Sequence, residues 1–294
     1  MALRPGPLRV FASKWTCEAA LGTSSVSVIA DALKKAGFAG LEASLSDLGQ
    51  TPAHRAEAAG ALRERGLGLG LGLYSGWTDC EQYSGVEPPA THLRCLETEL
   101  RAAEDLQPCF LNLHSGDDWW DDAQDREYFA GAADLLEGTT CRASHETHRG
   151  RPLGHPARAR RLLEAFPDLF LTLDVSHWFL VCERYFPLDP LTASRVRHVH
   201  ARAGSTQRPQ LRTVDVDAED EEARRALRAC EAAWAQVVFE AAPPGLTFNP
   251  EYGPPPYQPH TDTPAADLWS VTLRATDRLR RSFDPSREGP KSVK

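Results

Sequence analysis

The sequence of 294 residues has no long hydrophobic run. No apolar stretch approaches the roughly 18 residues that a transmembrane helix needs. The N-terminal segment MALRPGPLRV also lacks the apolar centre of a signal peptide. These absences argue against a membrane-spanning or secreted chain, so we expect a soluble, cytoplasmic protein with no membrane partner.

Basic residues are also scarce. Lys and Arg together number 33 against 41 Asp and Glu, which gives a net charge of -8. A surface that binds nucleic acid neutralises phosphates with positive charge, and this balance disfavours one, although a local basic groove is compatible with the average. We expect no nucleic-acid partner.

Two kinds of motif are missing as well. The 7 cysteines include no CxxC pair, which favours reduced thiols over a disulfide framework or a zinc knuckle. The run at 67–74, LGLGLGLY, does not match a phosphate-binding fingerprint. Its glycines are better suited to close packing or to a bend in a barrel wall.

The chain does contain a regular alternation of strand-like and helix-like segments. We predict strands at 8–12, 38–45, 67–74, 109–113, 139–146, 169–174, 196–201 and 246–251. We predict helices at 25–35, 52–65, 90–106, 124–136, 156–166, 218–238 and 265–283, with a short helical piece near 190. The segments after the first and sixth strands are expected to be loops.

Eight strands that alternate with helices indicate parallel strands joined by helical crossovers. The economical closed arrangement is a single (β/α)8 TIM barrel, an α/β fold, and an open doubly wound sheet is the alternative. With 41% hydrophobic and 25% charged residues, the chain can bury one large core. We expect one barrel domain at 1–283 and a polar tail at 284–294.

The last four predicted strands each stop at side chains that bind metal ions. In an extended segment side chains alternate, so Glu146 and His148 should point to one side and His145 to the other. Catalytic groups of such barrels lie at the C-terminal ends of the strands, where all these side chains fall. The candidates, strand by strand, are Glu146 with His148, Asp174 with His177, His198 with His200, and Glu251.

A donor set of three carboxylates and one histidine suits a hard or borderline divalent ion. Mn²⁺, Mg²⁺, Co²⁺ and Zn²⁺ all fit, and this set of donor atoms does not discriminate among the four ions. His198 and His200 share one face of their strand, so one can be a ligand while the other supports it or binds substrate. The sequence therefore predicts one divalent metal ion as cofactor.

The motifs ETH, DVSH, HVH and PEYG on these four strands resemble the xylose isomerase-like TIM barrels. That superfamily includes sugar isomerases, ketose 3-epimerases, inosose dehydratases and endonuclease-IV-type enzymes, and the resemblance extends from 8 to about 283. It implies one ion held by Glu146, Asp174, His200 and Glu251, with His177 as a substrate or second-metal contact.

The resemblance also implies a reaction. The expected activity is metal-dependent isomerisation or epimerisation of a sugar, polyol or related hydroxy-carbonyl compound through an enediolate, with Glu146 and Glu251 as acid and base. The alternatives are a dehydratase or lyase on a similar substrate, a catalytically silent sugar-binding module, and glutamates that only hold the metal.

Two narrower assignments fit less well. Endonuclease-IV-type enzymes use three zinc ions with further histidines on strand three and after strand seven. Here strand three ends at Tyr74 and the segment TVDVDAED contains no histidine, although His114 stands where a strand-four histidine is expected. Xylose isomerase itself binds two ions with more carboxylates and a longer chain.

Several further side chains are candidates for binding the substrate. Arginines that follow ligand strands suit a carboxylate or phosphate, although ion pairs with the acidic loop DDWWDD would explain them equally. Tryptophans on strand-end loops could cover a polyol ring or simply seal the loops. The candidates are Trp15, Glu42, His114, Trp119, His148, Arg149, His177, His198 and Arg202. A homo-oligomer is compatible with the sequence.

Overall fold

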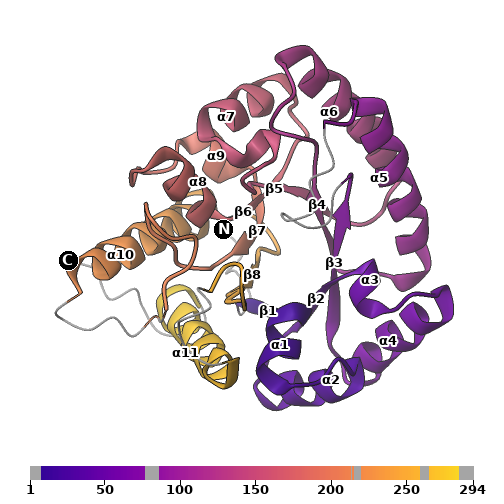
Figure 1. Ribbon diagram of the computed structural model, residues 1–294, viewed down its shortest axis with the longest axis vertical. Helices are drawn as coiled ribbons and strands as arrows, with labels where there is room; N and C mark the ends of the chain where they lie inside the picture. Colours follow the sequence, from indigo (N-terminus) through magenta and orange to yellow (C-terminus); the bar gives the residue numbers. More distant parts are fainter. Residues whose placement is uncertain (1–7, 77–85, 213, 215–219, 259–264, 285–294) are drawn as a thin grey trace, which may run out of the picture.

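Eight parallel strands form a closed barrel in the order β1 to β8, with helices between them on the outside (Figure 1). The computed structural model describes residues 8–76, 86–212, 214, 220–258 and 265–284. The strands are β1 (Arg9–Ser13), β2 (Gly40–Ser44), β3 (Gly68–Tyr74), β4 (Phe110–His114), β5 (Ala143–Glu146), β6 (Leu171–Leu173), β7 (Val196–His200) and β8 (Thr247–Asn249). The predicted (β/α)8 barrel is confirmed, and the open sheet is excluded because β1 pairs with β8.

The helices cover the barrel in chain order. They are α1 (Lys14–Leu21), α2 (Val26–Lys35), α3 (Leu45–Leu48), α4 (Pro52–Glu64), α5 (Pro89–Ala103), α6 (Asp122–Glu137), α7 (Pro156–Ala165), α8 (Val175–Cys182), α9 (Pro190–Ser194), α10 (Glu221–Ala235) and α11 (Ala265–Phe283). Short η1 (Glu104–Leu106) and η2 (Pro152–Gly154) are 3-10 turns, and η3 (Gln236–Ala241) is π-helical. Among the described residues, no helix has the length and apolarity to cross a membrane.

Local side-chain chemistry sets many of these boundaries. Ser25 caps α2 by accepting a hydrogen bond from the Val28 amide, and Gly37 follows the helix with a positive φ of 73°. Acidic side chains begin α10 in the same way. Asp220 caps the helix and Glu221 lies in its first turn, where negative charge is favourable.

The structure corrects the predicted loops after the first and sixth strands, which are the helices α1 and α8. It also shortens several strands, among them β5, β6 and β8. Thr139 closes the turn after α6 by donating its hydroxyl to Leu136 O, so β5 begins only at Ala143. Asp174 leaves β6 because its side chain caps α8, and Glu251 lies beyond β8 with a φ of 51°. The rest of the predicted tail at 284–294, beyond Asp284, is outside the described residues.

The β3 glycines leave room for aromatic rings inside the barrel. A Cβ on Gly70 would lie 2.3 Å from Phe110 Cζ, and one on Gly68 would lie 2.7 Å from Cys109 Sγ. Phe11 and Phe110 meet edge to face at 5.1 Å, and Phe110 stacks on the His198 ring at 4.4 Å. The expectation that these glycines serve close packing is confirmed, and the rings fill the barrel beneath the strand ends that carry the polar residues.

Candidate metal centre and active site

Four side chains predicted as metal ligands meet at the C-terminal mouth of the barrel. Glu146 ends β5, Asp174 follows β6, His200 ends β7 and Glu251 follows β8. Potential ligand atoms of the first three lie within 4.8 Å of one another, and Glu251 Oε2 lies 2.9 Å from His200 Nδ1. Figure 1 shows β5 to β8 converging at the centre of the molecule.

The observation that most favours a metal ion at this cluster is one nitrogen of His200. Its Nδ1 is buried and makes no hydrogen bond with any described residue, although it lies 2.9 Å from Glu251 Oε2 and 3.4 Å from Glu146 Oε1. A buried polar atom normally has a partner, and a nitrogen that faces two carboxylates fits either a proton on that nitrogen or a metal cation between the three groups. The residues present therefore fit a divalent ion.

The pKa of His200 also indicates that this position favours a positive charge. Burial acts to lower the pKa of this imidazole, but the carboxylates of Glu251, Glu42 and Glu146 outweigh burial and raise its pKa well above the usual value. This position therefore favours a bound positive charge, which is a proton or a metal ion.

Asp174 is fixed by its neighbours on two sides. Its Oδ1 accepts hydrogen bonds from the amide of Ser176 at 3.0 Å and from the Ser176 hydroxyl at 2.5 Å. Its Oδ2 accepts a bond from Arg202, whose Nη1 also lies 3.2 Å from Glu251 Oε2. Burial raises the pKa of Asp174 to about 6, while Arg202 opposes the shift and Glu251 adds to it.

Arg202 is thus held within the ligand cluster and does not pair with the acidic DDWWDD loop. Its guanidinium is fully buried, bridges two predicted ligands and lies over the Tyr257 ring at 4.1 Å. The carboxylates of Glu146, Asp174 and Glu251 outnumber this one cation. The excess negative charge is a second reason why the cluster fits a divalent ion.

Glu146 is oriented by two donors from β4. Its Oε2 lies 2.9 Å from both His114 Nε2 and Asn112 Nδ2, which leaves Oε1 directed at His200. Burial acts to raise the pKa of Glu146, but His114 and then His200 hold it well below its usual range. The carboxylate is therefore ionised at neutral pH.

A group of predicted substrate contacts lies beside Glu146. His148 and His177 have ring centroids 4.2 Å apart, and both can place a nitrogen within 4.8 Å of a Glu146 oxygen. His148 Nε2 meets the Tyr257 hydroxyl at 2.7 Å, and Arg149 Nη1 lies 3.0 Å from His177 Nδ1. Burial lowers the pKa of both histidines, so they are neutral at neutral pH.

His145 lies on the other side of β5, as the alternation predicted. Its Nδ1 contacts the Ser115 hydroxyl at 2.6 Å, and its ring meets Phe129 of α6 at 5.3 Å. His145 therefore packs between strand and helix, away from Glu146.

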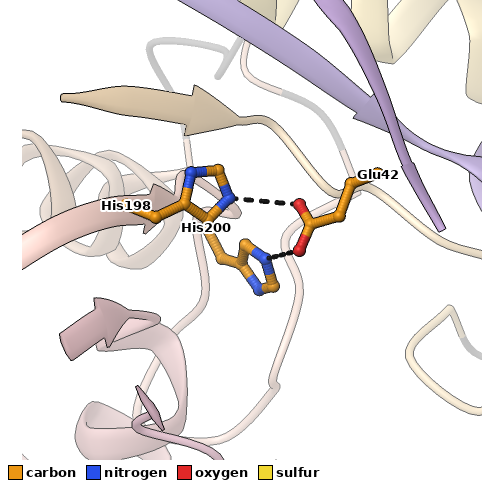
Figure 2. Close-up of side chains that lie close together, drawn as sticks. All are labelled: Glu42, His198 and His200. Carbon is orange, nitrogen blue, oxygen red and sulfur yellow. Dashed lines mark hydrogen bonds and ion pairs between the residues drawn. The ribbon is translucent and has the colours of Figure 1, made fainter. Parts of the chain in front are cut away.

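Glu42 and His198 were predicted to bind substrate, but both side chains are buried and bind each other. Figure 2 shows the Glu42 carboxylate between the rings of His198 and His200, with one oxygen directed at each. The distances from Nε2 to the carboxylate oxygen are 3.1 Å for His198 and 3.0 Å for His200. His198 Nδ1 is also bonded, to Thr247 Oγ1 at 2.7 Å.

The two tryptophans proposed for substrate binding differ in position. Trp15 packs edge to face on Tyr257 at 5.5 Å, beside the cluster. Trp119 is 75% exposed, and no contact between described residues joins it to the cluster. By contrast, Trp178 is buried with its indole N–H donated to Leu153 O, which is a sealing role.

Four further residues that organise this site were not predicted from the sequence. Asn112 and Asn249 interrupt apolar strands on the inward face, two residues before His114 and Glu251, so strand alternation alone could have indicated them. Ser176 and Tyr257 lie in a helix start and a loop, and no periodic signal marks them.

A family model for the xylose isomerase-like TIM barrel matches residues 30–221. Comparison with curated proteins by sequence gives no match.

Solved structures of similar fold cover nearly the whole chain. The D-allulose 3-epimerase from Methylomonas sp. in complex with D-allulose has 14% identity and a TM-score of 0.59, over 94% of this chain and 98% of that one. An L-ribulose 3-epimerase has 18% identity and a TM-score of 0.59, over 93% and 94%. The IolI protein with a zinc atom has 11% identity and a TM-score of 0.60, over 94% and 99%.

At these identities the structural likeness establishes the fold alone. The family model, however, spans more than half of the chain, including the ends of β5, β6 and β7. The chain therefore belongs to the xylose isomerase-like TIM barrel family.

Proposed function

We propose that this protein is a divalent-metal-dependent epimerase or isomerase of a sugar or a related hydroxy-carbonyl compound. The observation that carries the proposal is the buried His200 Nδ1, which has no hydrogen-bond partner among the described residues and faces the Glu146 and Glu251 carboxylates. The similar structures of D-allulose and L-ribulose 3-epimerases support the substrate class.

Glu146, Asp174, His200 and Glu251 would hold the ion. When bound, a divalent ion supplies Lewis-acid stabilisation of the negative charge that develops on substrate oxygens. Three carboxylates and an imidazole leave Mn²⁺, Mg²⁺, Co²⁺ and Zn²⁺ as candidates.

Glu146 and Glu251 are the groups that we assign to proton transfer. In the closed strand order, β5 and β8 are separated by β6 and β7, so the two carboxylates enter the barrel mouth from different strands. One removes the proton from the carbon beside the substrate carbonyl, and the other returns a proton to it. His114 and Asn112 support this role because they keep Glu146 ionised and oriented.

His148, His177 and Arg149 form the polar wall that we assign to the substrate. The neutral imidazoles suit hydroxyl groups. Among the described residues, no carboxylate forms an ion pair with Arg149, whose contacts are His177 and the Tyr257 ring. A hydroxy-carbonyl substrate that carries a carboxylate or phosphate would supply that partner.

The test is a panel of neutral ketoses, keto sugar acids and ketose phosphates, incubated in D₂O with metal-stripped protein and added Mn²⁺. We expect one class to yield an epimer or isomer with deuterium at the carbon next to the carbonyl, only when Mn²⁺ is present. Conversion that proceeds equally without metal would contradict the proposal. A product lighter than its substrate by one water would identify a dehydratase instead.

A further inference from the structure

Glu42 is the most fully hydrogen-bonded carboxylate beneath the site. Its Oε1 contacts His200 Nε2 at 3.0 Å and Asn112 Nδ2 at 3.2 Å, and its Oε2 contacts His198 Nε2 at 3.1 Å and Asn249 Nδ2 at 2.7 Å. Four donors from three other strands therefore surround one buried side chain of β2. These four donors already use the carboxylate oxygens of Glu42, so the oxygens are not available to accept a hydrogen bond from a substrate hydroxyl.

The contacts determine where each histidine carries its proton. An ionised carboxylate only accepts hydrogen bonds, so Nε2 of both His198 and His200 must carry hydrogen. His198 Nδ1 then accepts from the Thr247 hydroxyl at 2.7 Å. In a neutral His200, Nδ1 is left with the lone pair, and this is the nitrogen directed at Glu146 and Glu251. Figure 2 shows the two rings fixed on the two oxygens of Glu42.

Glu42 also connects to both proposed catalytic glutamates. The Asn112 amide that bonds Glu42 donates at 2.9 Å to Glu146 Oε2 as well. Asn249 bonds Glu42 through Nδ2 and accepts the Glu251 backbone N–H on Oδ1 at 3.0 Å. That second bond supports Glu251 in a left-handed conformation that residues other than glycine rarely adopt.

A cation bound by Glu42, His198 and His200 is the competing interpretation of this cluster, since the three groups lie close enough to share one. The amides of Asn112 and Asn249 argue against it, because both direct N–H groups at the same carboxylate oxygens. A cation there would face these donors, whereas the hydrogen bonds already satisfy both oxygens of Glu42 and the Nε2 of each histidine.

We infer that Glu42 is a positioning residue that holds His200 with its proton on Nε2 and its lone pair on Nδ1, directed at the metal. The inference rests on the metal centre of the proposed function. Carboxylates that accept a hydrogen bond from a metal-bound histidine fix its tautomer and raise its basicity, and their loss typically lowers metal affinity about 10- to 100-fold.

The test is Glu42→Gln, which keeps the size of the side chain but presents an N–H₂ group to one of the two histidines. Mn²⁺ affinity, measured by calorimetry on metal-stripped protein, should fall about 10- to 100-fold. The matched control is Asp125→Asn, at a buried carboxylate of α6 whose side chain binds Arg158 of α7 at 2.6 and 2.7 Å. It should keep the wild-type Mn²⁺ affinity.

A second measurement needs no variant. In Zn²⁺-loaded wild-type protein labelled with ¹⁵N-histidine, the His200 signals should show Nδ1 bound to metal and Nε2 bonded to hydrogen. Metal ligation through Nε2 would overturn the inference, as would a folded Glu42→Gln protein with unchanged Mn²⁺ affinity. Failure of the wild-type protein to bind any divalent ion would instead refute the metal centre itself.

Discussion

Glu146 and Glu251 differ in their surroundings although they have the same proposed chemistry. Glu146 is fully buried and accepts hydrogen bonds from His114 and Asn112, whereas the Glu251 side chain is 14% exposed and contacts Arg202. An acid and a base that act in turn on one carbon need unequal environments, because one must be ready to accept a proton while the other donates.

Replacing either glutamate by glutamine should remove a base while keeping a neutral oxygen donor of nearly the same volume. We expect Glu146→Gln and Glu251→Gln each to lower turnover by about 10²- to 10⁴-fold. Metal content has to be measured on the same samples, since a glutamine ligand also binds the ion less well. Glu231→Gln, at the Arg278 ion pair on α10, is the control and should keep full turnover. Near-normal rates in both metal-loaded variants would exclude both glutamates as bases.

The four proposed ligands could be chosen from the sequence because each follows an apolar strand in a fold that brings such ends together. The sequence could not predict the hydrogen bonds beneath them. Glu42 lies on β2 and His200 on β7, and no local pattern indicates that their side chains meet at 3.0 Å. The role of Glu42 therefore required the three-dimensional structure.

At the scale of elements, β3 shows how a strand supports the site. Its inward glycines admit the Phe110 ring, which in turn packs on His198. A longer side chain would push Phe110 toward the histidine that Glu42 holds.

We therefore expect Gly70→Ala to destabilise the protein by about 1–3 kcal/mol through overpacking. Gly72 is the control on the same strand, because a Cβ there would come no closer than 3.8 Å to Ala43 O. Gly72→Ala should leave the free energy of unfolding, measured in urea, unchanged or slightly higher, since alanine restricts the unfolded chain. Equal stability of the two variants would argue against the packing role of Gly70.

The elements that were predicted well have strong periodic patterns, as in α11, whose bounds match the prediction at 265–283. The missed helices α1 and α8 lack such patterns. The α8 segment VSHWFLVC is apolar on nearly all sides, so its sequence does not distinguish a helix from a buried loop. The Asp174 side chain accepts the Ser176 amide as a helix cap, and this signal was interpreted only as a metal ligand.

At the scale of the whole molecule, the proposed ion links folding to pH. The pKa of His200 is raised in the folded protein, so without metal its proton stabilises the fold fully below the unfolded value of about 6.5. That stability is lost as pH rises through the folded pKa. A bound ion replaces this proton, so metal binding should strengthen in the same direction.

The expected outcome is a larger rise in Tm on adding a fixed excess of Mn²⁺ at about pH 8 than at about pH 6. Thermal unfolding followed by circular dichroism, with and without Mn²⁺ at each pH, measures the difference. The Asp125→Asn protein should show the same pH trend as the wild type. A rise in Tm that is equal at both pH values would mean that the ion does not displace a proton from His200.

The most direct test of the proposed metal centre is a calorimetric titration of Mn²⁺ into metal-stripped wild-type, His200→Ala and His198→Ala proteins. We predict about one ion per wild-type chain, no measurable binding to His200→Ala, and affinity reduced about 10- to 100-fold in His198→Ala, because His198 contacts Glu42 and the His200 ring and is not itself a proposed ligand. Undiminished binding to His200→Ala, or no binding to the wild-type protein, would contradict a metal centre at the ends of β5 to β8.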